Sequence, residues 1–519
     1  MKLEGQMTIS EQKKAVSQPT ATKSDVNILA KGAGISLFGM FGGRALQLGG
    51  QILLARLLGP AGFGLFALGQ TIFQLGGRLG TLGLNAGVIR FGITARQEGE
   101  NRLSDVFRDT FFATFVSGLF FGGAVILFAP WLSQDVFKQP DLTHVLYGFG
   151  IAIMFNTWLN VTAAATRITY RMQYSALSLE LLPFLVNLIL IVALVYFLDL
   201  SIMGAVIALA GGYAAGLILS LIFVRNLFPK AKIIDTPSLP TIKELLSFSV
   251  PNSLAVVFNQ WLQNVTVLFL GLFMLPAEIG AFQAAEQISM LPAIVLLSFN
   301  KIFSPMITDI YEKREMGRLD ELFKISTKWG LYVSLPLLIV VIFCPSPVLR
   351  VVYGESYGTG TTVLLLITLA QIVNTATGSV ASILSMTGYQ KTFLFSTGIA
   401  FIACVGLNLG LTPLFGAIGA AVSLGCGIAL LNILLLCNVR RILGLWPYDR
   451  RYYKLLIALL PTAVMVFLLK QIWVDPSSWE LLFMTIASYG IFAVGLIVMK
   501  LEHYELLLIK ATVQKFIGK

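Results

Sequence analysis

The chain has 519 residues, of which 56% are hydrophobic and 12% are charged, and its formal net charge is +11. Soluble domains carry about 25% charged and about 45–50% apolar residues. The composition excludes a soluble enzyme, a disordered scaffold and a disulfide-stapled secreted domain, and its apolar runs of about 20 residues indicate an all-α polytopic membrane protein.

The N-terminal stretch 1–27 is polar and lacks the apolar core and cleavage pattern of a signal peptide, so we expect a disordered cytosolic tail. Fourteen apolar segments follow, each long enough to cross a hydrocarbon core of about 30 Å. The basic segment 500–519 after them is expected to lie along the inner leaflet as an amphipathic tail. The fourteen predicted transmembrane helices are 32–55, 63–89, 108–131, 143–166, 175–198, 202–224, 245–272, 278–300, 327–349, 363–386, 392–413, 416–438, 455–473 and 480–499.

The basic residues predict the orientation of these helices. With an even number of spans both termini lie on one side, and 31 of the 37 Lys and Arg residues fall on that side. The loops of the other side hold only Arg56, Lys138, Arg350 and Lys470. The positive-inside rule therefore predicts cytoplasmic N- and C-termini in the inner (plasma) membrane, and it accounts for the basic net charge without a nucleic-acid partner.

An internal repeat divides the chain. Pro60-Ala-Gly-Phe-Gly-Leu-Phe aligns with Pro276-Ala-Glu-Ile-Gly-Ala-Phe at an offset of 216 residues, and further matches follow at nearly the same offset. The repeat predicts a first six-helix bundle over 28–230, a second over 243–445, and two extra transmembrane helices over 455–499. Because an even number of spans separates the copies, the two bundles are parallel repeats, which typically surround a central cavity in transporters.

Polar side chains form stripes on the first two helices of each predicted bundle. A charged side chain in hydrocarbon costs about 2.5–3.5 kcal/mol on insertion scales, so such residues should face a wet cavity or a partner. The residues predicted to line the cavity and bind substrate are Arg44, Gln47 and Gln51 in span 1, Gln70, Gln74, Arg78 and Asn85 in span 2, Asn259 and Gln263 in span 7, and Gln283 and Glu286 in span 8.

Two arginines in this set lie at matched depth. Arg44 is 13 residues from Lys31 and Arg78 is 12 from Arg90, which places both about 18–20 Å from the cytosolic end of their helices. Two guanidinium groups on neighbouring helices suit the oxygens of a phosphate. The alternative is that each arginine holds helices together through a carbonyl or a glutamine.

Glu286 is the acid near the middle of span 8, and three roles are open to it: an ion pair with an arginine, binding of a coupling cation, or proton uptake. Glu180, near the cytosolic start of span 5, is interpreted as interfacial. Two histidines and four cysteines without ligand spacing predict neither a metal site nor a cofactor.

The sequence also resembles a known family. The run from Arg44 through Pro60 to Phe66 resembles the opening of the polysaccharide transporter family, the Wzx-type oligosaccharide flippases of the multidrug/oligosaccharidyl-lipid/polysaccharide exporter superfamily. Tyr353-Gly-Glu-Ser-Tyr and Phe415-Gly-Ala-Ile-Gly-Ala-Ala extend the likeness over about 28–445. The resemblance implies an arginine-lined central cavity, with Arg44 at a position where the family commonly has arginine, whereas members often carry an acid or a small residue near Arg78.

The function expected on these grounds is a flippase that moves a polyprenyl-diphosphate-linked oligosaccharide from the inner to the outer leaflet by alternating access, for polysaccharide or O-antigen export. An enzyme is not expected, because no loop is long enough for a folded catalytic domain. The alternatives are a lipid II flippase and a multidrug/cation antiporter of the same superfamily. Expected partners are the lipid-linked substrate, the bilayer, and the glycan polymerase and glycosyltransferases of the same pathway.

Overall fold

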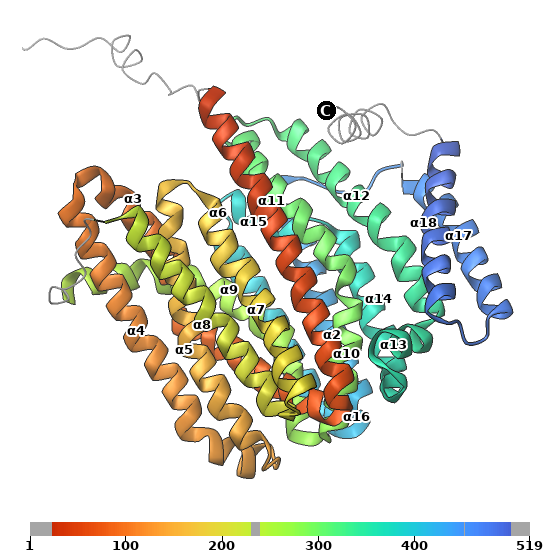
Figure 1. Ribbon diagram of the computed structural model, residues 1–519. Coiled ribbons are helices and arrows are strands. Elements are labelled where there is room, and N and C mark those ends of the chain that lie inside the picture. Colours follow the sequence, from red (N-terminus) through yellow and green to blue (C-terminus); the bar gives the residue numbers. More distant parts are fainter. Residues whose placement is uncertain (1–22, 230–238, 451, 500–519) are drawn as a thin grey trace, which may run out of the picture.

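The computed structural model describes residues 23–229, 239–450 and 452–499, and every regular element in those ranges is a helix (Figure 1). Apolar segments of this length favour helices because a helix satisfies its own backbone polar groups where water is absent. We call the end at which α2 begins and α18 ends the upper end, and the end at which α2 turns at Gly59 the lower end.

The first bundle runs from α2 to α8. Its elements are α2 (Lys23–Thr81), α3 (Leu84–Glu98), α4 (Glu100–Trp131), η1 (Leu132–Val136), α5 (Leu142–Thr166), η2 (Arg167–Thr169), α6 (Met172–Ser175), η3 (Ala176–Leu181), α7 (Leu182–Ile191), η4 (Val192–Phe197) and α8 (Ser201–Leu227).

The second bundle and the C-terminal pair follow. The second bundle contains α9 (Leu239–Phe273), α10 (Pro276–Ser289), α11 (Leu291–Glu312), α12 (Met316–Phe343), α13 (Pro345–Tyr353), η5 (Glu355–Gly360), α14 (Thr361–Thr377), α15 (Val380–Met386) and α16 (Gln390–Leu443), and the C-terminal pair is α17 (Tyr452–Ile472) and α18 (Ser478–Val498).

Two of the longest helices fold back on themselves. In α2 the backbone leaves the helical region at Gly59, with φ 67° and ψ 176°. The Gln51 amide then donates a hydrogen bond of 3.2 Å to Gln70, although these residues would lie about 28 Å apart in a straight helix. α2 is therefore a hairpin of two limbs, 23–58 and 60–81. α16 bends in the same way at Gly416, where φ is 58°.

Eleven helices in the described ranges are long and apolar enough to cross a membrane. One of the eleven, Gly39–Glu98, contains the α2 hairpin, and another, Gln390–Leu443, contains the bend of α16. The segment of α10 and α11 is not among them, so the number of fourteen crossings stays a prediction. The predicted continuous span 63–89 is interrupted, because Leu82 and Gly83 have φ of 47° and 72° between α2 and α3.

Helices α2–α8 pack mainly on one another, and so do α9–α16. The contacts between these groups come chiefly from α2 and α3, which lie against α9 and α10. α17 and α18 pack on each other and on α12, at the side of the second bundle (Figure 1). These three groups of helices are called the first bundle, the second bundle and the C-terminal pair.

The two bundles are in close backbone contact at the lower end. A Cβ on Gly64 would lie 1.8 Å from the Pro276 carbonyl oxygen, and one on Gly280 would lie 2.0 Å from the Pro60 carbonyl oxygen. Only glycine permits this approach of α10 to the second limb of α2. Beside the crossing, the ring of Phe63 lies 6.3 Å from the rings of both Tyr353 and Tyr357, between centroids. The lower end is therefore closed by tight packing between the bundles.

Two predicted tails lie largely outside the described residues. Residues 1–22 of the predicted tail 1–27 are not described, whereas 23–27 already belong to α2, so the predicted boundary of the tail was wrong by a few residues. The predicted amphipathic tail 500–519 lies wholly outside the described residues.

Candidate functional site

Arg44 and Arg78 lie on the two facing limbs of α2, and both side chains are exposed. Arg44 donates a hydrogen bond of 3.0 Å to Gln47, which lies on the same limb, so this bond does not hold two helices together. Within the described part of the chain, the Arg78 guanidinium has no hydrogen bond or ion pair. Among the described residues, neither guanidinium makes a hydrogen bond or an ion pair that joins two helices.

Arg44, Arg78 and Tyr213 lie within electrostatic range of one another. Arg44 and Arg78 interact electrostatically with each other and with Tyr213, which α8 contributes. Two cations on facing limbs repel, and a bound anion removes that repulsion while accepting hydrogen bonds from both guanidinium groups. The two arginines therefore form an exposed basic pair in the first bundle.

Glu180 belongs to the surroundings of this site and was not among its predicted members. It lies on the π-helix η3, within electrostatic reach of Tyr213 and Arg167. Gly43 makes that position possible, because a Cβ there would lie 2.0 Å from the Glu180 carbonyl oxygen. The signal that could have identified Glu180 is its charge within an apolar segment, which is the same signal that singled out Glu286. Tyr213 gave no comparable signal, because an aromatic residue in a membrane helix is common.

Gln47, Gln51 and Gln70 face the interior of the first bundle. They line a small cavity of about 30 Å³ together with Asn187 and Tyr213 from α7 and α8. A cavity of this size has room for about one water molecule. These three glutamines therefore surround a water-sized cavity next to the arginine pair, and this cavity does not itself hold a sugar.

The remaining predicted polar residues are distributed over several places. Gln74 accepts a hydrogen bond of 3.0 Å from Gln260 of α9, so it joins the two bundles. Asn85 lies beyond the helix break, where its side-chain oxygen accepts a bond from the Ala86 amide, and it does not continue the stripe of the second limb. The half-buried members on α9 and α10 are Asn259, Gln263 and Gln283.

Glu286 on α10 is 5% exposed. Across the described residues its carboxylate has no hydrogen bond or ion pair, so the ion-pair role lacks a partner. Its neighbour Gln287 accepts a hydrogen bond of 2.9 Å from the Tyr353 hydroxyl, while the buried Gln287 amide nitrogen has no partner among the residues that the structure describes. Burial raises the pKa of Tyr353.

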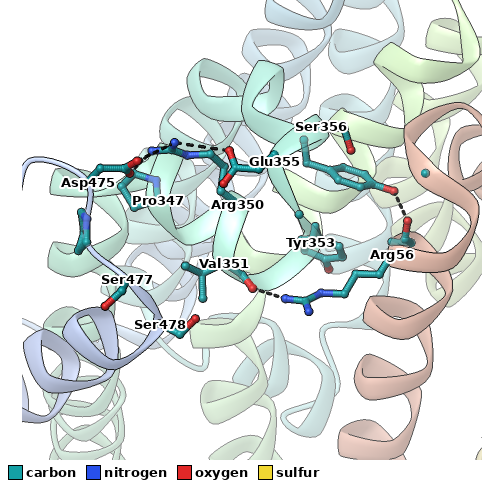
Figure 2. A pocket seen from close by; sticks show the side chains of 15 residues that line it. Arg56, Pro347, Arg350, Val351, Tyr353, Glu355, Ser356, Asp475, Ser477 and Ser478 are labelled. Atoms are coloured by element: carbon teal, nitrogen blue, oxygen red, sulfur yellow. Dashed lines mark hydrogen bonds and ion pairs between the residues drawn. The ribbon is translucent and has the colours of Figure 1, made fainter.

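Two larger cavities lie near the lower end. One of about 550 Å³ is lined by polar groups of α2, α13, η5 and the loop before α18, among them Arg56, Arg350 and Asp475 (Figure 2). The other, of about 320 Å³, is lined mostly by aliphatic side chains of α2, α10, α12, α13 and α18. A search of the described residues for clusters of three or more His, Cys, Asp or Glu finds none that could hold a metal ion.

Comparison with known families gives one match over more than half of the chain. Residues 53–361 match a family described as "Polysaccharide biosynthesis protein". A search of curated protein sequences finds no match.

Comparison with solved structures finds the same fold in several transporters. The chain is similar to the lipid II flippase MurJ in an inward closed conformation, with a TM-score of 0.70, 15% identity, and coverage of 88% of this chain and 97% of MurJ. An inward-facing multidrug resistance MATE family transporter of the MOP superfamily has a TM-score of 0.64 and 17% identity, with coverage of 79% of this chain and 98% of that transporter. A MOP superfamily transporter from Pyrococcus furiosus, described as having a binding pocket of reverse polarity, has a TM-score of 0.58 and 16% identity, with coverage of 82% of this chain and 99% of that transporter.

Proposed function

The chain belongs to the polysaccharide biosynthesis protein family, and on that premise we propose that it is a flippase for a polyprenyl-diphosphate-linked oligosaccharide. The substrate moves from the inner to the outer leaflet by alternating access, with its glycan passing between the two bundles and its prenyl chain remaining in apolar surroundings. The reaction is transport, and no catalytic step is assigned to the protein.

The observation that carries this proposal is that Arg44 and Arg78, two exposed arginines on the facing limbs of α2, lie within electrostatic range of each other and of Tyr213. A diphosphate is the charged part of such a substrate, and it offers several oxygens to two forked donors. Both arginines are exposed, and in the described residues neither is neutralised by an acid in an ion pair. The site therefore favours an anion and disfavours the cationic drugs of an antiporter.

The aliphatic cavity of about 320 Å³ supports a substrate with an apolar tail. It lies between α2, which carries both arginines, and α18 of the C-terminal pair. Apolar walls of this kind favour the burial of a hydrocarbon chain, and part of a prenyl chain can lie there while the diphosphate stays at the arginines.

The closed lower end supports alternating access. The Gly64 and Gly280 contacts exclude passage at that end, so a substrate carried through the protein requires a second arrangement in which the bundles separate there. In the predicted orientation the lower end faces out of the cell, so the arrangement seen here is the one that is closed to the outside.

Glu286 is proposed as the coupling residue. An acid without a protein partner at this depth favours proton uptake or a bound cation over a structural ion pair. The lipid II flippase and the multidrug/cation antiporter remain the alternative functions. We also propose contact with a glycan polymerase and glycosyltransferases, because such a substrate implies a pathway that contains them.

Reconstitution into liposomes tests the proposal. The assay follows a fluorescent undecaprenyl-diphosphate oligosaccharide across the bilayer with wild-type protein, Arg44→Ala and Arg78→Ala, and with Arg225→Ala as the control, since Arg225 is an exposed arginine of the last turn of α8. We expect both site variants to slow translocation by about ten-fold or more, as for loss of a hydrogen bond to a charged group, and the control to match the wild type. Wild-type rates in both site variants would contradict the proposed site.

Lipid II and a cationic dye, tested in parallel, distinguish the two alternative functions.

A further inference from the structure

Arg56 joins the two bundles at the lower end. Its Nε donates a hydrogen bond of 2.8 Å to the Val352 carbonyl, and its Nη2 donates to the Val351 carbonyl (Figure 2). These carbonyls belong to the last turn of α13, where no intrahelical donor remains, and a cation at a helix C-terminus is favoured by the helix dipole. A first-bundle side chain therefore caps a helix of the second bundle.

A side chain of the second bundle makes the reciprocal contact to the first. The Tyr357 hydroxyl donates a hydrogen bond of 2.7 Å to the Ala55 carbonyl, and both residues are buried. Ala55 lies in the last turn of the first limb of α2, before the bend at Gly59. Each bundle thus supplies a donor to a backbone carbonyl near the other bundle's helix end, and separating the bundles here removes both contacts together.

The C-terminal pair holds α13 from its other side. Arg350 of α13 donates to both carboxylate oxygens of Asp475, one of them at 2.9 Å, and lies 3.6 Å from Glu355 (Figure 2). Asp475 is in the loop between α17 and α18, which lie outside the repeat. α13 is therefore bound by α2 on one side and by the C-terminal pair on the other.

The repeat does not supply a second contact of this kind. At the offset of 216 residues, Arg56 corresponds to Leu272, whose aliphatic side chain cannot donate a hydrogen bond. The Arg56 contact is therefore one-sided. Arg56 and Arg350 are also two of the four basic residues that the sequence places away from the cytosolic loops.

We propose that α13 is the latch of the lower end: the reciprocal caps of Arg56 and Tyr357 hold the two bundles together, and Asp475 of the C-terminal pair positions α13 through Arg350. This proposal rests on the alternating access of the proposed function. It assigns to α17 and α18 a role in the stability of the closed state, which explains why a pair of helices outside the repeat contacts the end of α13.

Distance measurement by pulsed electron paramagnetic resonance tests the latch without any substrate, so its failure is distinguishable from a failure of the proposed function. Spin labels are attached to cysteines that replace Asp141 and Thr359, which are exposed at the lower end in different bundles. The exposed native cysteines, Cys426 and Cys437, are first replaced by alanine. The variants compared on this background are Arg56→Gln, Tyr357→Phe, Asp475→Asn and, as the control, Lys138→Gln, which removes an exposed charge at the same end.

We expect Arg56→Gln to raise the fraction of long distances by roughly five-fold, since hydrogen bonds to a charged group are lost. Tyr357→Phe and Asp475→Asn should raise it by smaller factors, and Lys138→Gln should reproduce the wild-type distribution. Wild-type distributions in both Arg56→Gln and Tyr357→Phe would overturn the latch. A wild-type distribution in Asp475→Asn alone would overturn the positioning role of the C-terminal pair.

Discussion

Gly64 and Gly280 occupy equivalent places in one contact, because each lies against the carbonyl oxygen of the proline that begins the opposite helix segment. A Cβ on Gly64 would lie 1.8 Å from the Pro276 oxygen, and one on Gly280 would lie 2.0 Å from the Pro60 oxygen. Their separation in sequence equals the repeat offset of 216 residues. The internal repeat thus reappears as a nearly two-fold contact at the closed end of the bundle.

Alanine at either glycine should weaken this closure. The obstructing atoms are backbone, so no side-chain rotation relieves the clash, and we expect each of Gly64→Ala and Gly280→Ala to cost about 1–3 kcal/mol or more, as for an overpacked core. The thermal unfolding midpoint in detergent should fall by similar amounts in both variants. Gly49→Ala is the control, because nothing lies within 4 Å of a Cβ there. A large drop in only one of the two site variants would contradict the equivalence of the contacts.

Lysine at the arginine pair separates the effect of charge from that of geometry. Arg44→Lys and Arg78→Lys retain the positive charge but lose the planar fork that binds two phosphate oxygens. We expect translocation of the diphosphate-linked lipid to slow by about ten-fold in each, as for the loss of one charge-assisted hydrogen bond. Arg225→Lys is the matched control. If both site variants transport at the wild-type rate, positive charge alone is sufficient and the forked contact is not used.

Glu286→Gln tests coupling without altering shape. The amide replaces a carboxyl group that has no partner among the described residues, so the unfolding midpoint should change little. If Glu286 takes up a proton or a cation during transport, the variant should lose the acceleration that an imposed pH or cation gradient produces. Glu278→Gln, at an exposed acid on the same helix, should retain it. Equal acceleration in Glu286→Gln and the wild type would exclude Glu286 as the coupling residue.

The buried pair of Tyr353 and Gln287 predicts a compensating effect. Tyr353→Phe removes the only described donor to the Gln287 side-chain oxygen, and an unsatisfied buried polar group costs about 1–3 kcal/mol. The double variant Tyr353→Phe with Gln287→Met replaces both partners by apolar groups, so it should recover most of the unfolding midpoint. Additive losses in the double variant would mean that the hydrogen bond is not what stabilises this pair.

The all-helical membrane fold could be predicted because hydrophobic runs of about 20 residues are a local signal. The interruption at Leu82 and Gly83 could not, since glycine is common in membrane helices and the positive φ of Leu82 has no sequence signature. The predicted span 327–349 was also too long, because α12 ends at Phe343 and α13 begins at Pro345. Proline at the start of α13 was the available signal.

The candidate site was predictable only in part. Arg44 and Arg78 stand out because a charge in an apolar segment is costly wherever it occurs. Tyr213, by contrast, reaches them from α8 through packing of distant segments, and no periodicity within one helix encodes such a contact. The same reason applies to Arg56, whose partners on α13 are 295 and 296 residues away.

The central claim is that the arginine pair binds the diphosphate of a lipid-linked glycan during transport. Its most direct test is the rate at which wild-type protein in liposomes translocates two fluorescent lipids with the same glycan and prenyl chain, one with a diphosphate link and one with a monophosphate link. We predict translocation of the diphosphate lipid well above that of protein-free liposomes, and a rate about ten-fold lower for the monophosphate lipid, as one charged contact is lost. Equal rates for the two lipids, or no translocation above protein-free liposomes, would contradict the claim.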